Sequence, residues 1–178
     1  MARYNRNFTP GGTFYVTLSL ADRQSSALVD HIAALRTAMH RAREKAHFGI
    51  KALVVLPNHL HAVVTLPQGD DDFTGRWRLI NSGFASAIAA VDSSINCDAD
   101  DEYALWQKRY WEHAISDDTD LARHIEYIHF NPVKHGLVER VSEWPHSSFH
   151  RYVRRGLLPD DWASTAVLPG EDFGEFEA

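Results

Sequence analysis

IKALVVLPNHLHAVVTL, residues 50–66, contains two runs rich in valine and leucine on either side of Pro57 and Asn58. Such residues favour extended strands, and a Pro-Asn pair between two apolar runs is typical of a turn. The segment therefore predicts two antiparallel strands, residues 50–56 and 59–66, joined as a tight hairpin.

The sequence before the hairpin predicts one strand and one helix. Apolar and polar residues alternate from residue 13 to residue 20, which is the pattern of a half-buried strand. From Ser26 the apolar positions recur at helical spacing until the pattern fades near Gly49. Ser25 or Ser26 can cap this helix.

The sequence after the hairpin predicts a helix, a strand and another helix. A helical pattern surrounds Trp77, and the aromatic-rich residues 105–115 predict a strand. Residues 117–120 are mostly acidic and open a third helix, because acidic groups stabilise the positive end of a helix. This helix is expected to stop near Asn131, because Pro132 disfavours helical geometry in the residue before it and Gly136 soon follows.

This order of elements predicts an α+β sandwich with one antiparallel sheet and helices packed mainly on one face. A length of 178 residues suits one domain that buries its core without disulfides or structural metals. The single cysteine, Cys97, cannot form an internal bridge. The sequence shows no secretory signal and no apolar run near the ~20 residues of a bilayer span. These features predict a soluble, cytoplasmic protein that does not bind a membrane.

The charge distribution is compatible with a nucleic-acid partner, although the net charge of -6 argues against one. No lysine or arginine follows Arg155, and residues 156–178 hold six acidic residues, so residues 1–155 sum to zero. We therefore divide the chain into a domain of residues 1–155 and an acidic C-terminal tail of residues 156–178. Before the tail, Arg151, Arg154 and Arg155 alternate with His150 and Tyr152. This mixture suits single-stranded nucleic acid, and it also suits a solvated helix face.

His59 and His61 are candidate metal ligands. They lie two residues apart on a predicted strand, so both imidazoles point to the same face. Two neutral ring nitrogens at this spacing can hold one divalent cation. The alternative is a strand edge with two partly exposed histidines. The metal interpretation is favoured because both residues interrupt an apolar strand, where an unsatisfied imidazole would be costly.

Tyr127 and Asn131 are candidate partners of the histidine pair. They are four residues apart on a predicted helix and therefore share a face, which can present a phenol and an amide oxygen together. A tyrosine is a plausible nucleophile when a metal and nearby cations stabilise its phenolate. The alternative for Tyr127 alone is ordinary core packing with its hydroxyl at the surface.

Six segments of the chain resemble one family, the REP-associated tyrosine transposases, which are a branch of the IS200-like, HUH single-strand transposase superfamily. The resemblance covers roughly residues 3–155, and its most specific parts are the histidine pair and the later Tyr-Ile-x-x-Asn-Pro-Val motif. The six segments are residues 10–15, 56–61, 76–80, 106–113, 127–138 and 144–148.

The resemblance implies a ferredoxin-like core and a metal-dependent DNA-cleaving and strand-joining enzyme. Asn131 would complete a Mg²⁺ or Mn²⁺ site with His59 and His61. Tyr127 would become linked to the 5′-phosphate of single-stranded DNA while a free 3′-hydroxyl leaves. The substrate would be a palindromic repeat folded as a hairpin.

The remaining assignments concern DNA contacts and supporting histidines. We assign Arg76 and Arg78 to DNA contacts, together with Arg151, Arg154 and Arg155, and we expect Trp77 to be a core anchor. His113, His124 and His129 could assist at the metal or move protons, but surface or core roles are the alternative for each.

Two other functions fit the same sequence. One is a hairpin-binding protein without cleavage activity, and the other is a metal-dependent hydrolase of small phosphoesters. The oligomeric state is open between monomer and dimer, with a monomer favoured.

Overall fold

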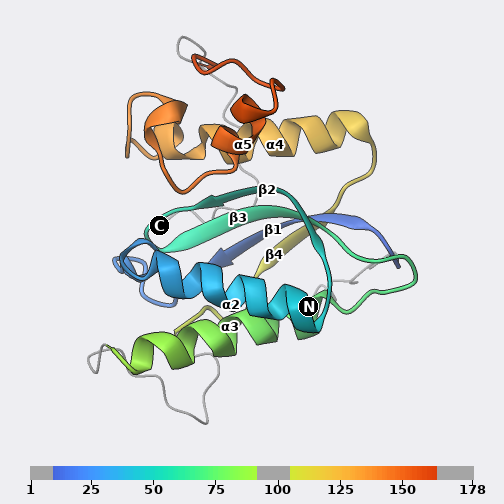
Figure 1. The fold of residues 1–178 in the computed structure, drawn as a ribbon, viewed down its shortest axis with the longest axis vertical. Helices are drawn as coiled ribbons and strands as arrows, with labels where there is room; N and C mark the ends of the chain where they lie inside the picture. The colour runs from blue at the N-terminus through green and yellow to red at the C-terminus, as the bar shows by residue number, and fades with distance from the viewer. Residues whose placement is uncertain (1–9, 92–104, 164–178) are drawn as a thin grey trace, which may run out of the picture.

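A four-stranded antiparallel sheet forms the centre of the protein (Figure 1). The structure is a computed structural model, and it describes residues 10–91 and 105–163. The strand order is β2-β3-β1-β4, and the strands are β1 (Thr13–Ser19), β2 (Gly49–Val55), β3 (His59–Thr65) and β4 (Trp111–Ala114). With a helix between β1 and β2 and another between β3 and β4, this is the ferredoxin-like arrangement. The predicted fold class and the predicted hairpin are confirmed.

Two helices lie between β1 and β2 in the chain, α1 (Ala27–Asp30) and α2 (Ile32–Lys45). A third, α3 (Phe73–Ala89), lies between β3 and β4. The single helix predicted from Ser26 is thus two helices, which meet at His31. Figure 1 shows α2 and α3 side by side on one face of the sheet. Phe14, Val16 and Leu18 of β1 point to this face and share one hydrophobic cluster with both helices, because alternate residues of a strand face the same side.

The opposite face of the sheet is covered by α4 (Asp118–Lys134), so the helices do not lie on one face alone (Figure 1). Tyr15, Val54 and Val63 of the sheet pack with Tyr127 and Ile128 of α4 in a second hydrophobic cluster. The short helices η1 (Val141–Glu143) and α5 (Phe149–Arg154) follow α4 on this side. The sheet is therefore buried on both faces, with two long helices on one and α4 on the other.

α4 continues one turn beyond its predicted end and contains Pro132. A proline removes its own amide donor and crowds the carbonyl four residues earlier, but near a helix end few later turns depend on that hydrogen bond. Gly136, with φ of +66°, stops the helix, and the Leu137 amide donates to the Pro132 carbonyl at 2.9 Å. The prediction of a stop near Asn131 was wrong because this closing turn outweighs the proline signal.

The strand predicted over residues 105–115 is also shorter than expected. Only Trp111–Ala114 forms β4, and the preceding part keeps a single bridge between Leu20 and Trp106. Trp106 is fully buried, and its ring lies 4.7 Å from that of Trp77 between centroids. Trp77 is the core anchor that the sequence predicted. Within the described ranges, no helix has the length and apolar character needed to cross a membrane.

Candidate active site

Two histidines on the central strand β3 form the base of the site. His59 and His61 share the face of the sheet that α4 covers, and their ring centroids lie 4.9 Å apart. His61 is fully buried, and His59 is partly buried. The alternation of strand side chains thus brings the two imidazoles together, as predicted.

The neighbouring strand β1 holds His61 from behind. Thr17 is paired with His61 across the sheet, and its hydroxyl lies 2.9 Å from Nδ1 of the histidine. The Tyr15 hydroxyl lies 2.8 Å from the same nitrogen, and Thr17 donates a hydrogen bond to Tyr15 at 3.3 Å. These contacts orient the imidazole through Nδ1, so a metal ion would be coordinated through Nε2.

The turn of the hairpin orients His59 in the same way. Nδ1 of His59 donates to the Asn58 side-chain oxygen at 2.6 Å, because that oxygen can only accept. The Asn58 side-chain nitrogen donates in turn to the Arg23 carbonyl. A neutral His59 that donates through Nδ1 carries its lone pair on Nε2, the form that binds a metal.

α4 brings Tyr127, Asn131 and His135 over the histidine pair. The Tyr127 ring lies 5.6 Å from the His61 ring, and the His135 ring lies 5.1 Å from the His59 ring, between centroids. Asn131 is one helical turn from each of these residues on the same face, and it is fully buried. Asn131 therefore lies between Tyr127 and His135 and faces the two imidazoles of β3. Tyr127 follows His61 by 66 residues in the sequence. The phenol and the histidine pair nevertheless meet in one site.

Lys134 lies beside the phenol. Its ammonium donates a hydrogen bond to the Tyr127 hydroxyl at 3.0 Å and lies 4.8 Å from the centroid of the Tyr127 ring. The sequence did not indicate this residue, because the helix was expected to end near Asn131 and Lys134 follows it. Once Pro132 is known to be helical, the spacing of seven residues from Tyr127 places Lys134 on the same face.

The side chains at this site fit a divalent cation. Two imidazole nitrogens suit transition metals and an amide oxygen suits Mg²⁺ or Mn²⁺, so His59, His61 and Asn131 are a mixed donor set. All three lie on rigid elements, and the two imidazoles are already oriented by hydrogen bonds on their Nδ1 sides.

A second group that could hold a metal ion consists of His113, Asp120 and His124, with ligand atoms within 4.8 Å of one another. The Asp120 carboxylate lies 2.9 Å from Nε2 of His113 and 3.0 Å from Nδ1 of His124. Burial works against ionisation of Asp120, but hydrogen bonds from the Ser116 amide and from His113 hold its pKa below the usual value. Burial lowers the pKa of His124. Sequence reasoning missed Asp120 because it appeared only as an acid at a helix start.

This second group adjoins the first through the sheet. The His124 ring lies 4.7 Å from the ring of Tyr15, whose hydroxyl contacts His61. His113 and His124 stack at 4.9 Å between centroids. Tyr15 therefore stands between the two histidine groups.

Arg76 has a structural position, contrary to the expected DNA contact. Its side chain is 4% exposed, and its guanidinium donates to the Asp70 carboxylate, the Asp72 carbonyl and the His47 carbonyl. Hydrogen bonds from Arg76 and from the Asp72 amide lower the pKa of Asp70. The guanidinium is hydrogen-bonded to the loop before α3 and to the His47 carbonyl, and it lies away from the surface. The sequence did not show that Asp70 would be its partner.

The other predicted DNA contacts lie on two sides of the molecule. Arg78 is exposed on α3, whereas Arg154 and Arg155 are exposed at the end of α5, beyond the opposite face of the sheet (Figure 1). Arg151 is partly buried, and it donates to the Ile50 carbonyl at 3.1 Å. The structure brings the three α5 arginines together but separates them from Arg78.

His129 lies on the far side of α4 from Tyr127. It is fully buried, its Nε2 lies 2.9 Å from the Ser148 hydroxyl, and burial, with a smaller effect of Arg151, lowers its pKa to about 4. Trp162 packs near the same histidine, at 6.3 Å between ring centroids. The packed part of the chain thus extends past Arg155, the expected domain end, and the expected tail beyond residue 163 lies outside the described residues.

Two curated proteins of one family are similar to the chain over nearly its whole length. No model of a known protein family matches the chain. The chain is 44% identical over 163 residues to the REP-associated tyrosine transposase of Escherichia coli (strain K12), with 92% of both chains covered. It is 41% identical over 170 residues to a protein of Haemophilus influenzae that carries the same family name, with 94% of this chain and 97% of the relative covered.

A solved structure of a REP-associated tyrosine transposase bound to a REP hairpin superposes with a TM-score of 0.88 at 41% identity, covering 100% of this chain and 99% of that chain. Both the sequence relatives and this structure extend over nearly the whole length of the chain. The protein therefore belongs to the family of REP-associated tyrosine transposases, enzymes that cleave and join DNA strands, as its motifs predicted.

Proposed function

We propose that this protein is a metal-dependent endonuclease and strand transferase that cleaves single-stranded DNA at palindromic repeat hairpins through a 5′-phosphotyrosine intermediate. The observation that carries the proposal is the meeting of the Tyr127 phenol with the imidazoles of His59 and His61 in one site. The named family and the hairpin bound in the related structure support hairpin DNA as the substrate.

The reaction assigns a separate role to each group. The phenolic oxygen of Tyr127 forms a bond to the scissile phosphorus, and the bond from phosphorus to the 3′ oxygen breaks. The phenol gives up its proton, and the departing 3′ oxygen takes one up to leave as a hydroxyl. The ammonium of Lys134, 3.0 Å from the phenolic oxygen, would stabilise negative charge on that oxygen. A later attack by a 3′-hydroxyl on the phosphotyrosine reverses these bond changes and joins two strands.

His59, His61 and Asn131 would hold the cation, Mg²⁺ or Mn²⁺. Such a cation polarises a phosphate and offsets the negative charge that develops during the displacement. Arg78 and the three arginines of α5 remain proposed DNA contacts. Residues 1–155 form the proposed transposase domain. Since Tyr127 reaches His61 within one chain, a monomer is sufficient for the chemistry.

The test is covalent capture of a labelled single-stranded hairpin DNA in the presence of Mn²⁺. The wild-type protein should form a protein-DNA adduct, and Tyr127→Phe should abolish the adduct while hairpin binding is retained. Tyr110→Phe is a matched control, because it also removes a tyrosine hydroxyl but on the face of the sheet that α3 covers. The Tyr110 hydroxyl hydrogen-bonds to Thr74, and its ring packs against Phe73. This variant should still form the adduct.

Three outcomes would overturn the proposal. Binding without any wild-type adduct would indicate a hairpin-binding protein that does not cleave. An adduct that persists in Tyr127→Phe would place the nucleophile elsewhere. Turnover of p-nitrophenyl phosphate that is unaffected by Tyr127→Phe, with no adduct, would indicate a hydrolase of small phosphoesters.

A further inference from the structure

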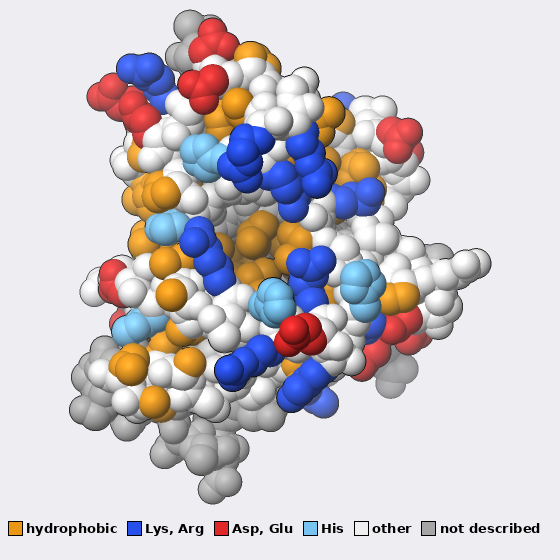
Figure 2. All heavy atoms as spheres, viewed as in Figure 1, with side chains coloured by type: hydrophobic (Ala, Val, Ile, Leu, Met, Phe, Trp, Pro, Cys, Tyr) orange, Lys and Arg blue, Asp and Glu red, His pale blue; other side chains and the backbone are white. Residues whose placement is uncertain are grey.

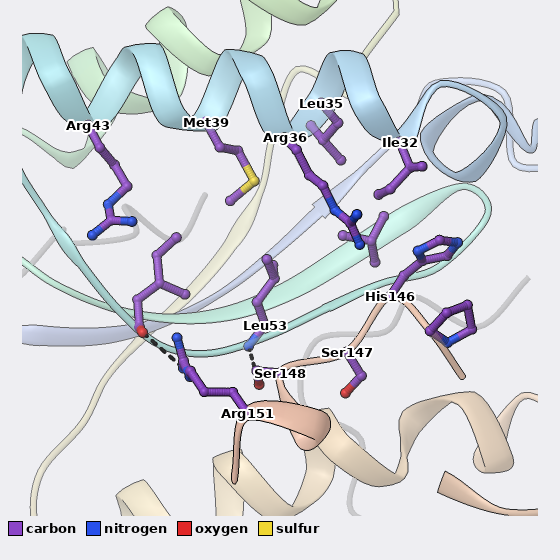
Figure 3. Close-up of a pocket in the computed structure, with 13 residues that line it drawn as sticks. Ile32, Leu35, Arg36, Met39, Arg43, Leu53, His146, Ser147, Ser148 and Arg151 are labelled. Carbon is purple, nitrogen blue, oxygen red and sulfur yellow. Dashed lines mark hydrogen bonds between the residues drawn. The ribbon is translucent and has the colours of Figure 1, made fainter. Parts of the chain in front are cut away.

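A cavity of about 250 Å³ lies between α2, the edge strand β2 and the segment of residues 145–148 that leads into α5 (Figure 3). Leu35 and Met39 of α2 and Leu53 of β2 provide apolar walls. Figure 2 shows the hollow as a group of hydrophobic side chains surrounded by lysine and arginine side chains. The cavity thus joins an apolar interior to a cationic rim.

Three arginines line the cavity from two sides. Arg36 and Arg43 extend from α2, and Arg151 extends from α5 on the other side (Figure 3). Arg43 donates through Nε to the Phe48 carbonyl at 3.1 Å, and Arg151 donates to the Ile50 carbonyl. These bonds position two of the guanidinium groups and leave further N–H donors on each. No acidic residue lines the cavity, so a ligand here should carry negative charge.

The cavity lining also holds two polar atoms whose hydrogen-bonding capacity is not used. Among the described residues, nothing forms a hydrogen bond with Nδ1 of His146 or with Nε of Arg151, although both atoms are buried. Buried polar atoms are rarely left in this state, and each such atom requires an explanation. Burial, together with Arg36, lowers the pKa of His146, so the imidazole is neutral at pH 7 and can donate at one nitrogen and accept at the other.

We infer that this cavity receives the base of one unpaired nucleotide of the bound DNA, with its flanking phosphates on Arg36, Arg43 and Arg151. The inference rests on the proposed function, since it takes DNA as the substrate. A volume below the ~300–1,000 Å³ of sites for drug-sized ligands suits a single flat ring system. Apolar contact, with stacking on the His146 ring or on a guanidinium plane, would retain a base, and the arginines would retain its phosphates. Arg154 and Arg155 extend the positive surface from Arg151 for the adjoining nucleotides.

The cavity is separate from the site of Tyr127 and therefore can be tested without cleavage. It lies at the edge of the sheet beside α2, whereas Tyr127 packs on the other face. All binding measurements would use the Tyr127→Phe protein, so the result does not depend on whether an adduct forms. The probe is a labelled DNA hairpin with a single-stranded flank, together with versions that carry an abasic site at each flank position in turn.

One abasic position should weaken binding by roughly 5- to 100-fold, which is the range for loss of one stacked base. Filling the cavity by Met39→Trp should weaken binding of the intact DNA by a similar factor and remove the sensitivity to that abasic position. Arg36→Ala should weaken binding more than Arg41→Ala, a matched control on the same helix that does not line the cavity. Thermal melting of each variant checks that it is folded.

The inference is overturned if no flank position is sensitive to loss of its base. It is equally overturned if the sensitivity persists in Met39→Trp, or if Arg36→Ala and Arg41→Ala have equal effects. Competition by free deoxynucleoside monophosphates without any abasic sensitivity would show a site for soluble nucleotides instead. In each case covalent capture by Tyr127 is measured separately, so failure of the cavity and failure of the cleavage proposal are distinguishable.

Discussion

Protonation of His129 should destabilise the protein as the pH falls. His129 is fully buried on α4, and its pKa in the folded protein is about 4, against an ordinary value near 6.5 in an unfolded chain. The unfolded chain therefore binds a proton more readily between these values. The contribution of the neutral histidine is complete above about pH 6.5 and is lost as the pH falls toward 4.

The magnitude follows from the interval between the two pKa values. At about 1.36 kcal/mol per pH unit, the full interval corresponds to about 3 kcal/mol. Between pH 7.5 and pH 4.5 the loss from this one residue is about 2.5 kcal/mol. A change of this size is large compared with the ~5–15 kcal/mol of free energy that stabilises a typical domain.

The assay is urea unfolding at pH 7.5 and at pH 4.5 for wild type and for His129→Gln. Glutamine keeps a polar group near the Ser148 hydroxyl but does not titrate, so the variant should lose about 2.5 kcal/mol less than wild type over this range. His40→Gln is the control, because the His40 side chain is 73% exposed, and its pH dependence should match wild type. The reasoning is refuted if His129→Gln and wild type show the same pH dependence.

Three further predictions concern the site and its surroundings. Thr17→Val removes a hydrogen bond to Nδ1 of His61 and should weaken Mn²⁺ binding by roughly 10- to 100-fold in titration calorimetry, while an unchanged affinity would exclude a positioning role. Lys134→Ala should slow adduct formation by at least about tenfold and Lys134→Arg should restore most of the rate, because the proposed role of Lys134 is to place a cation at the phenol. Arg76→Ala should lower the melting temperature by several degrees with little effect on DNA affinity of the remaining folded protein, whereas Arg78→Ala should weaken DNA binding without loss of stability.

Local periodicity was sufficient to predict β1, β2 and β3 to within a residue at each end, together with the first half of the site. The hairpin of residues 50–66 follows from β-favouring residues around a Pro-Asn turn, and the alternation of its residues places His59 and His61 on one face. Helical spacing likewise placed Tyr127 and Asn131 together. What periodicity does not encode is the face of the sheet on which a helix packs, because that depends on contacts between distant segments.

The residues that sequence reasoning missed depend on such distant contacts. Lys134 was missed because Pro132 and Gly136 together predicted a helix end near Asn131, whereas the helix continues through Pro132 to Lys134. Arg76 was assigned to a DNA contact, and its burial was missed because its partner Asp70 lies in a loop without periodicity. Pairing between a loop and a helix is set by tertiary packing and leaves no repeated pattern in the sequence.

Ser148 links α4, which carries Tyr127, to the sheet, which carries His59 and His61. It exchanges hydrogen bonds with Leu53 of the edge strand, since the Leu53 amide donates to its hydroxyl at 3.0 Å and its own amide donates to the Leu53 carbonyl at 2.7 Å. The same hydroxyl contacts His129 on the back of α4. The Ser148 hydroxyl therefore bridges the edge strand β2 and α4, on the side of α4 opposite Tyr127. Since Ser148 also lines the arginine-rimmed cavity, a base seated there would contact the residue that helps to position α4.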